Sequence, residues 1–286
     1  MKKISDFFSE HFNGKVRKIA LNAGLGCPGR CIYCNDAAFN PAYANRTPGS
    51  ITEQLRKGIE FVGPKGRASI YLGYFQSYTN TFGETSTLIP LYEEALSYPG
   101  VGGLVIATRP DCISDSMMDW LESRFGRKAP SGHPFLLMEI GVESTIDATL
   151  EIIGRGHGWE CSKRTILELD RRGINVGVHL ILGLPGENEA DFISHAERIS
   201  ELPIKTLKLH QLQVLEGTPL ARIWRENPSF VKLFTPEEYA GVVHKFLDHL
   251  NPAIALDRFV SEAPPALVLA PRWNLKPEEF NRILFG

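Results

Sequence analysis

Short apolar runs alternate along the chain with longer segments in which apolar residues recur every three or four positions. The first pattern is typical of buried parallel strands and the second of amphipathic helices, so the sequence predicts repeated βα units and an α/β fold. The runs richest in Val, Ile and Leu predict six strands, over residues 16–23, 68–75, 103–107, 135–142, 175–182 and 206–214.

Helix start signals lie between these runs. Ser50 is followed three residues later by Glu53, and Thr235 is followed by Pro236 and then by Glu238. A small polar residue with Glu three positions later is a capping box, and Pro is favoured in the first helical turn. Further helices are expected to begin near Ser114, Ser162 and Glu189.

Parallel strands joined by helices form either an open doubly wound sheet or a barrel. Residues 24–29, GLGCPG, match a dinucleotide-binding GxGxxG motif in letters only, because Cys and Pro stand where a helix should begin. We therefore predict one domain, residues 1–286, built on a partial parallel (β/α)6 TIM-like barrel. Its core covers about residues 16–218, with a short N-terminal extension and a helical C-terminal extension over about 219–286.

Composition narrows the class of protein. The 286 residues are 43% hydrophobic and 22% charged with a formal net charge of -2, which gives no global attraction to nucleic acid or anionic membranes. No apolar segment approaches the ~20 residues of a membrane span, and the N-terminus lacks the apolar core of a signal peptide. Five cysteines, an odd number, indicate a reducing compartment, so we expect a cytoplasmic protein. The isolated Cys112 and Cys161 are expected to be buried apolar residues.

Three cysteines crowd into the loop after the first strand: Cys27, Cys31 and Cys34. In a parallel barrel this loop lies at the end of the strands that carries the active site. Three thiolates on a four-iron cluster leave one iron without a protein ligand, open to a substrate. The alternatives are a zinc site completed by a distant Cys or His, or three unrelated cysteines.

The CxxxCxxC spacing, with the aromatic Tyr33 before the last cysteine, resembles the signature of radical S-adenosylmethionine (SAM) enzymes. The resemblance implies a [4Fe-4S] cluster whose open iron binds SAM, and an electron from a flavodoxin- or ferredoxin-like donor that breaks SAM into methionine and a 5'-deoxyadenosyl radical. The cofactor then supplies the chemistry and the protein supplies orientation.

Further segments, among them YLGYFQSYTNTFGET, MEIGVES, IGRGH and GVHLILGLPGE, resemble the YhcC/YtqA-type radical SAM proteins, relatives of the Elongator catalytic subunit. The resemblance covers nearly the whole chain. Many of these relatives have a longer segment between the first two cysteines than the CxxxC present here.

By this resemblance, the residues that bind SAM come from the ends of successive strands. Tyr33 is expected near the adenine, and polar groups after the second strand near the amino group. Acidic residues of the fourth strand, which share one face, suit the ribose and the amine. The fifth strand and its glycine-rich turn are expected beside the adenine. The predicted cofactor-binding residues are Tyr33, Gln76, Tyr78, Asn80, Glu139, Glu143, Ser144, His179, Ile181 and Gly183.

Other polar residues have two possible roles. His179 and His210 suit either substrate contact or the commoner fate of a buried, hydrogen-bonded histidine. Arg109, Arg155 and His157 are candidates for carboxylate contacts, since the forked guanidinium of Arg binds carboxylate or phosphate.

Two classes of function follow. The first is a radical SAM enzyme that acts on a transfer RNA base, because Elongator-type relatives modify wobble uridine, or otherwise on a small molecule or peptide. A basic cluster, expected near the barrel mouth, suits phosphate contact or a solvated face: Lys2, Lys3, Lys15, Arg17 and Lys18. The second is a non-catalytic iron-sulfur or RNA-binding module. The oligomeric state is not determined by the sequence.

Overall fold

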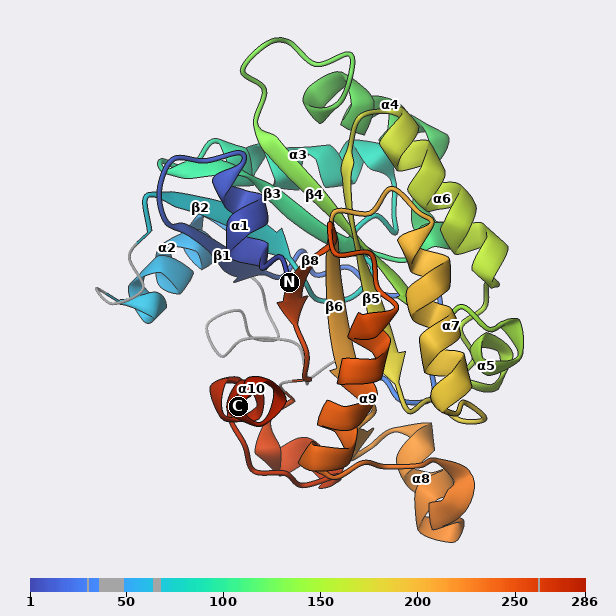
Figure 1. Cartoon of the computed structure of the whole chain (residues 1–286). Helices are drawn as coiled ribbons and strands as arrows, with labels where there is room; N and C mark the ends of the chain where they lie inside the picture. The colour runs from blue at the N-terminus through green and yellow to red at the C-terminus, as the bar shows by residue number, and fades with distance from the viewer. Residues whose placement is uncertain (30, 36–48, 64–67, 262) are drawn as a thin grey trace.

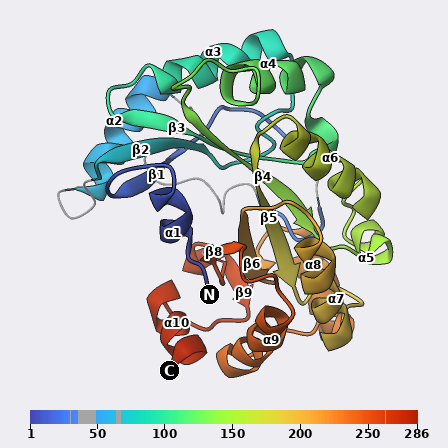
Figure 2. The ribbon, with the colours of Figure 1, turned by 45° about the horizontal axis from the view of Figure 1, so that its top comes forward.

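A computed structural model describes residues 1–29, 31–35, 49–63, 68–261 and 263–286. Its main sheet has seven strands, all parallel, in the order β1-β2-β3-β4-β5-β6-β8. The sheet curls into a half barrel (Figures 1 and 2), which confirms the predicted class. Its first six strands are those expected from the sequence: β1 Val16–Leu21, β2 Ile70–Phe75, β3 Val101–Thr108, β4 Phe135–Glu143, β5 Asn175–Leu182 and β6 Thr206–Gln211.

The seventh strand was not predicted. β8, Ala255–Arg258, lies in the segment expected to be a helical extension, and it pairs with β6 in parallel. Only four residues long, with Asp257 and Arg258 at its end, it lacks an apolar run. Its position is determined by its neighbours in the sheet rather than by local pattern.

The two faces of the sheet carry different side chains. Alternate residues such as Ile106, Met138 and Leu209 belong to a large apolar cluster that also contains helix residues such as Leu55 and Tyr92. This convex face is covered by helices (Figure 1). They are α2 Ile51–Val62, α3 Thr85–Leu96, α4 Asp115–Phe125, α6 Trp159–Arg171, α7 Glu189–Ser200 and α9 Pro236–Asp248.

The helix start signals were largely correct. The hydroxyls of Ser50, Ser114 and Thr235 accept hydrogen bonds from backbone amides three residues later. Helix α6 begins at Trp159, earlier than the predicted start near Ser162, because the amide of Trp159 donates to the Asp147 carboxylate (2.6 Å). No helix in the described ranges is long and apolar enough to cross a membrane.

The concave face is closed at the N-terminal ends of the strands. Phe7 and Phe8 of α1, Ile4–Ser9, pack with inward-facing residues of four strands, among them Leu72, Val105 and Phe135. Figure 2 shows α1 on the inner side of the curved sheet, between β1 and β8. This apolar plug fills one end of the half barrel, so the polar residues of the concave face lie toward the other end.

The remaining strands and helices flank the main sheet. The short strands β7, Val214–Leu215, and β9, Val268–Ala270, pair antiparallel in a second sheet. Helices α5, Asp147–Ile152, and α8, Pro219–Glu226, lie beside the C-terminal end of the main sheet, and α10, Pro277–Phe285, packs on α9.

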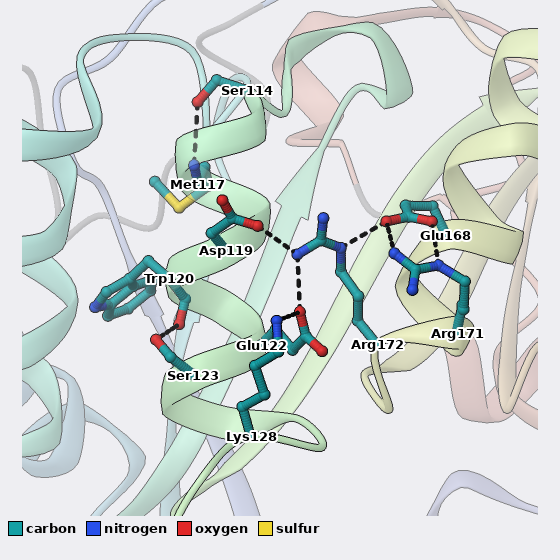
Figure 3. Close-up of polar contacts among 10 residues, drawn as sticks. All are labelled: Ser114, Met117, Asp119, Trp120, Glu122, Ser123, Lys128, Glu168, Arg171 and Arg172. Atoms are coloured by element: carbon teal, nitrogen blue, oxygen red, sulfur yellow. Dashed lines mark hydrogen bonds and ion pairs between the residues drawn. The ribbon is translucent and has the colours of Figure 1, made fainter.

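An ion-pair network on the outside joins α4 to the end of α6 (Figure 3). The Arg172 guanidinium contacts Asp119 (2.7 Å), Glu122 (3.0 Å) and Glu168 (2.6 Å). Glu168 also pairs with Arg171 (2.6 Å), whose side chain is 64% exposed. We call Asp119, Glu122, Glu168 and Arg172 the outer network.

Candidate active site

The cysteine loop lies at the C-terminal end of the main sheet, as predicted. Cys27, Cys31 and Cys34 follow Leu21, the last residue of β1. None of the three is in a disulfide; Cys31 is buried, Cys34 is half-buried and Cys27 is exposed. This is the edge of a parallel barrel at which catalytic groups gather.

Backbone hydrogen bonds anchor this loop. The amide of Ile32 donates to the carbonyl of Ile153 (3.0 Å), and the carbonyl of Ile32 accepts from the amide of Leu220 (2.8 Å). Within the loop, the amide of Cys34 donates to the carbonyl of Cys31 (3.0 Å). The loop is therefore held between the end of α5 and the start of α8.

The segment after β2 lies beneath the loop. Thr79 Oγ1 lies 2.9 Å from Cys27 Sγ, within hydrogen-bond distance. Asn80 is buried, and its Nδ2 donates to the carbonyls of Phe75 and Ala107 (both 2.9 Å). The side-chain amide of Asn80 therefore fixes the turn that carries Thr79. Its predicted contact with SAM stays a prediction.

Two other predicted residues of this segment are more open. Gln76 and Tyr78 are both partly exposed. Tyr78 adopts a left-handed backbone conformation with φ of 66°, which is uncommon outside glycine. Such conformations occur at functional turns, which agrees with the predicted role of the segment.

Tyr33 packs against an apolar cluster that contains Ile181 of β5 together with Leu212. Burial, the largest influence, and the nearby Glu143 carboxylate raise the pKa of Tyr33 well above its ordinary value. The phenol therefore stays protonated. A flat apolar surface beside the cysteines suits a purine ring, so Tyr33 and Ile181 remain the predicted adenine contacts.

The turn after β5 requires glycine at Gly183, where φ is +99°. A Cβ there would lie 3.1 Å from the Phe234 ring and 3.3 Å from the carbonyl of Lys232. The turn is thus packed tightly on the segment before α9. Its predicted position beside the adenine is not tested by these contacts.

At the end of β4, Ser144 takes part in a buried network. Its hydroxyl donates to Glu187 Oε1 (2.5 Å) and accepts from the amide of Ile146 (3.0 Å). His195 lies between Glu187 (3.2 Å) and the hydroxyl of Thr145 (2.8 Å). This network links the turns after β4 and β5, and Ser144 contributes to it through its only polar side-chain group.

Glu143, one residue earlier, faces Arg155. Arg155 Nη2 lies 3.5 Å from Glu143 Oε1, and Arg155 Nη1 donates to Cys31 Sγ (3.6 Å). Arg155 also donates to the carbonyl of Gly141. The fold therefore brings Glu143 and Arg155, two candidate site residues from the sequence, together beside Cys31.

Glu139 lies deeper in the barrel. Its Oε2 accepts from Tyr74 Oη (2.7 Å) and Lys208 Nζ (2.6 Å) and lies 3.0 Å from His179 Nε2. Asp257 bridges Lys208 (3.2 Å) to Lys18 (2.5 Å). Lys18 in turn lies 3.6 Å from Glu139 Oε1, which closes a ring of alternating charges. We call Lys18, Glu139, Lys208 and Asp257 the inner ring.

The two cations of the inner ring determine the charge of its acids. Burial, the largest influence, raises the pKa of the Glu139 carboxyl, but Lys208 and Lys18 together with His179 reverse this and hold the pKa well below its usual value. Asp257 shows the same balance, with burial opposed by Lys18 and Lys208, and its pKa also lies below the ordinary value. Both acids are therefore charged. The predicted contact of Glu139 with SAM is untested, and its carboxylate already has partners in the ring.

The two strand histidines lie together. The ring centroids of His179 and His210 are 5.8 Å apart, and His210 Nδ1 lies 3.2 Å from the Ser261 hydroxyl. Burial and the nearby Arg258 lower the pKa of His210 well below its ordinary value, so the imidazole is neutral. Both histidines have hydrogen-bonded side chains, and their contact with a substrate stays a prediction.

Two further candidates are engaged within the protein. Arg109 forms a fork with Asp111 (2.9 and 2.7 Å) and donates to the carbonyl of Arg155 (2.6 Å). His157 donates from Nδ1 toward the carbonyl of Gly158 (3.3 Å). Burial and nearby Arg155 lower the pKa of His157 to about 4, so it is neutral at pH 7.

The sequence missed two residues of the inner ring, Lys208 and Asp257. Lys208 alternates with apolar residues in a predicted strand, and a charged residue at an inward position was the available signal. The basic cluster was placed wrongly. Lys15 immediately precedes β1 and Lys18 is its third residue, whereas the cysteines follow the other end of β1. Lys18 points inward to Asp257 instead of toward solvent.

The donor set fits a [4Fe-4S] cluster better than a single metal ion. Among the described residues, no three His, Cys, Asp or Glu side chains lie close enough to bind one ion. In a four-iron cluster each thiolate binds a different iron, so the thiols need not converge on one point. The contacts of Thr79 and Arg155 with two of the sulfurs suit thiolate ligands.

Comparison with known proteins agrees with this site. Residues 21–199 match the Radical SAM superfamily model, and residues 204–284 match that of the Radical_SAM C-terminal domain. Protein YhcC of Escherichia coli (strain K12) is 34% identical over 93% of this chain and 84% of its own length. A tRNA uridine(34) acetyltransferase of Dehalococcoides mccartyi is 23% identical over 94% of this chain and 63% of its own length.

The fold has a solved counterpart. The structure of Methanocaldococcus infernus Elp3 with an N-terminal deletion superposes with a TM-score of 0.70 at 17% identity, over 95% of this chain and 62% of that chain. Members of the superfamily are generally enzymes that bind a [4Fe-4S] cluster and SAM. The extent of the family match, together with the three cysteines after β1, shows that the chain belongs to the radical SAM superfamily.

Proposed function

We propose that this protein is an enzyme that reductively cleaves SAM at a [4Fe-4S] cluster held by Cys27, Cys31 and Cys34. The observation that carries the proposal is the position of three cysteines, none of them in a disulfide, at the C-terminal end of the half barrel. The cluster and SAM, when bound, supply one-electron cleavage of a C–S bond and a 5'-deoxyadenosyl radical. A flavodoxin- or ferredoxin-like protein is the proposed electron donor.

The residues around the loop orient these cofactors and exclude water. The apolar cluster behind Tyr33 forms one wall, and the aromatic plug of α1 closes the opposite end of the barrel. A dry interior protects a reactive radical from side reactions. The inner ring supplies fixed ammonium and carboxylate groups on the concave face, where a substrate would be oriented.

Anaerobic reconstitution tests the cofactors. The wild-type protein should bind about four irons and show broad visible absorption, and alanine at any one of Cys27, Cys31 or Cys34 should abolish both. The matched controls are Cys112→Ala and Cys161→Ala, which should keep the cluster. Stoichiometric zinc without iron after reconstitution would contradict the proposal.

Product analysis tests the reaction. After reduction with dithionite, the reconstituted protein should convert SAM to methionine and 5'-deoxyadenosine. A stable four-iron cluster with no SAM turnover under these conditions would favour a non-catalytic iron-sulfur module instead.

The proposed substrate is a transfer RNA base. Support comes from the relatives: an enzyme of tRNA uridine(34) is similar over 94% of this chain, and an Elp3 structure shares its fold. Nucleoside analysis of tRNA from a deletion strain should show loss of one modified nucleoside, restored by the wild-type gene and not by the Cys31→Ala variant. An unchanged nucleoside profile would leave a small molecule or peptide as the substrate.

A further inference from the structure

A buried arginine contacts one of the three cysteine sulfurs. Arg155 is 6% exposed, and its Nη1 donates to Cys31 Sγ at 3.6 Å. Cys31 is itself buried, at 5% exposure. The contact therefore lies away from bulk solvent, where a charge acts strongly on its neighbours.

The guanidinium is held in place from several sides. Nη2 donates to the carbonyl of Gly141 and lies 3.5 Å from Glu143 Oε1. A Cβ at Gly141 would lie 2.7 Å from Arg155 Nη2 and 2.7 Å from Glu143 Oε1, so only glycine leaves room for this arrangement. The carbonyl of Arg155 accepts from Arg109 (2.6 Å), which fixes the backbone as well.

One hydrogen-bond donor of Arg155 is not used within the described part of the chain. Its Nε is buried without a hydrogen-bond partner among the described residues. Burial opposes the charge, but the Glu143 carboxylate, the largest of the opposing influences, raises the pKa of Arg155 above its ordinary value, so the guanidinium is permanently charged. A fixed cation thus lies between a cysteine sulfur and a carboxylate.

We infer that Arg155 and Glu143 set the reduction potential of the cluster bound through Cys31, with opposite effects. Reduction adds one electron from the external donor, so the reduced cluster is more negative by one charge. A cation or hydrogen-bond donor at a ligating sulfur stabilises the reduced form and raises the potential. Glu143 partly neutralises this cation and lowers the potential. The inference rests on the proposed cluster.

The test is a redox titration of the reconstituted protein without SAM, monitored by the magnetic resonance signal of the reduced cluster. Arg155→Met should lower the potential, so that the ratio of reduced to oxidised cluster at a fixed ambient potential falls about tenfold, or about 59 mV for one electron. Glu143→Gln should raise that ratio. Arg155→Lys should fall between wild type and Arg155→Met, since it keeps the charge and loses the fork.

Controls distinguish a change in reduction potential from a loss of the cluster or of the fold. Iron content is measured for each variant, and Arg172→Gln, on the outer face, should leave the potential unchanged. If Arg155→Met fails to hold iron, Glu143→Gln and Arg155→Lys still decide the matter. Four-iron variants with wild-type potentials would overturn the inference while leaving the proposed function intact, whereas a wild type without iron would defeat the proposed function itself.

The same variants address contact with SAM. If Arg155 served only to bind the SAM carboxylate, Arg155→Met would weaken SAM binding and leave the SAM-free potential unchanged. That result would also overturn the inference.

Discussion

The outer network and the inner ring use the same kinds of charged groups on opposite faces of one sheet. In the outer network, Arg172 joins two neighbouring helices, and Asp119 is 70% exposed (Figure 3). In the inner ring, the side chains of Lys208 and Glu139 are 3% and 1% exposed. In the outer network Asp119 and Glu168 keep part of their hydration while Arg172 and Glu122 are largely buried, whereas all the inner charges have exchanged most of their hydration for one another.

This difference determines what each set can do. A buried ion pair often stabilises a protein no more than apolar residues of the same volume would, but removing one partner leaves an uncompensated charge. Removing one residue of the inner ring should therefore lower the free energy of unfolding strongly. The main use of the ring is the set of fixed charges that it holds inside the barrel. Removing a residue of the outer network should cost less free energy of unfolding, and this network serves to hold α4 against α6.

The largest effect is expected for Lys208→Met. It leaves two buried carboxylates with one ammonium group, and the free energy of unfolding should fall by about 3–5 kcal/mol. Urea denaturation monitored by circular dichroism measures it. The control is Lys208→Met combined with Glu139→Gln, which restores charge balance. The double variant should be more stable than the single one, and a loss equal to the sum of the two single losses would contradict the ring.

The second largest effect is expected from acid, through the pH dependence of the free energy of unfolding. Because the pKa values of Glu139 and Asp257 are depressed in the folded protein, their ion pairs stabilise it above the ordinary carboxyl range, and this stability is lost as pH falls below about 4. Arg171 and Arg172 lower the pKa of Glu168 to about 2, so the outer network titrates in the same window.

Salt distinguishes them, because 1 M NaCl screens exposed charges and spares buried ones. Unfolding measured from pH 7 to pH 3 should keep most of its acid sensitivity in 1 M salt. An acid response abolished by salt would place the effect on the surface instead.

A smaller effect is expected for Arg172→Gln. The variant loses contacts with three carboxylates, of which Glu122 is largely buried and keeps Lys128 at 3.0 Å. The free energy of unfolding should fall by about 1 kcal/mol at low salt, because the pairs with Asp119 and Glu168 are partly exposed and Glu122 keeps Lys128 as a partner. Thermal unfolding at low and high salt measures it, and a loss that persists undiminished at 1 M NaCl would argue against an electrostatic origin.

The smallest effect is expected for Arg171→Gln, which removes one exposed pair with Glu168 within the last turn of α6. A change of about 0.2–0.5 kcal/mol is typical of such helix pairs. The same unfolding series measures it. A loss as large as that of Lys208→Met would remove the distinction between the two faces.

The sequence was a good guide wherever local pattern determines structure. Apolar runs identify six strands, because a strand covered on both faces needs continuous apolar residues. The charged residues of β8 hide its position in the sheet, since Asp257 is stabilised by lysines on β1 and β6 rather than by its neighbours in sequence. Such long-range compensation leaves no local pattern to read.

The same reason limited the site. The spacing of Cys27, Cys31 and Cys34 identifies the family because all three lie in one loop. Arg155 was recognised only as a candidate carboxylate contact, and its position at Cys31, 124 residues away in sequence, emerges from the fold. Lys18 was assigned to a basic surface because its neighbours Lys15 and Arg17 are basic, although strand alternation turns it inward.

The inner ring also sets an order of assembly. Lys18 and Asp257 are 239 positions apart, and the carbonyl of Lys2 accepts from the amide of Leu256. During synthesis at roughly 5–20 residues per second, Lys18 of β1 therefore waits many seconds for its partner Asp257, and β6 waits for the strand that covers its edge. Until β8 arrives, both lysines lack one of their acids and the edge of β6 is unpaired. The segment that completes the neutralisation of the barrel interior is thus made after the six other strands of the main sheet, which makes loss of β8 more damaging than its small size would suggest.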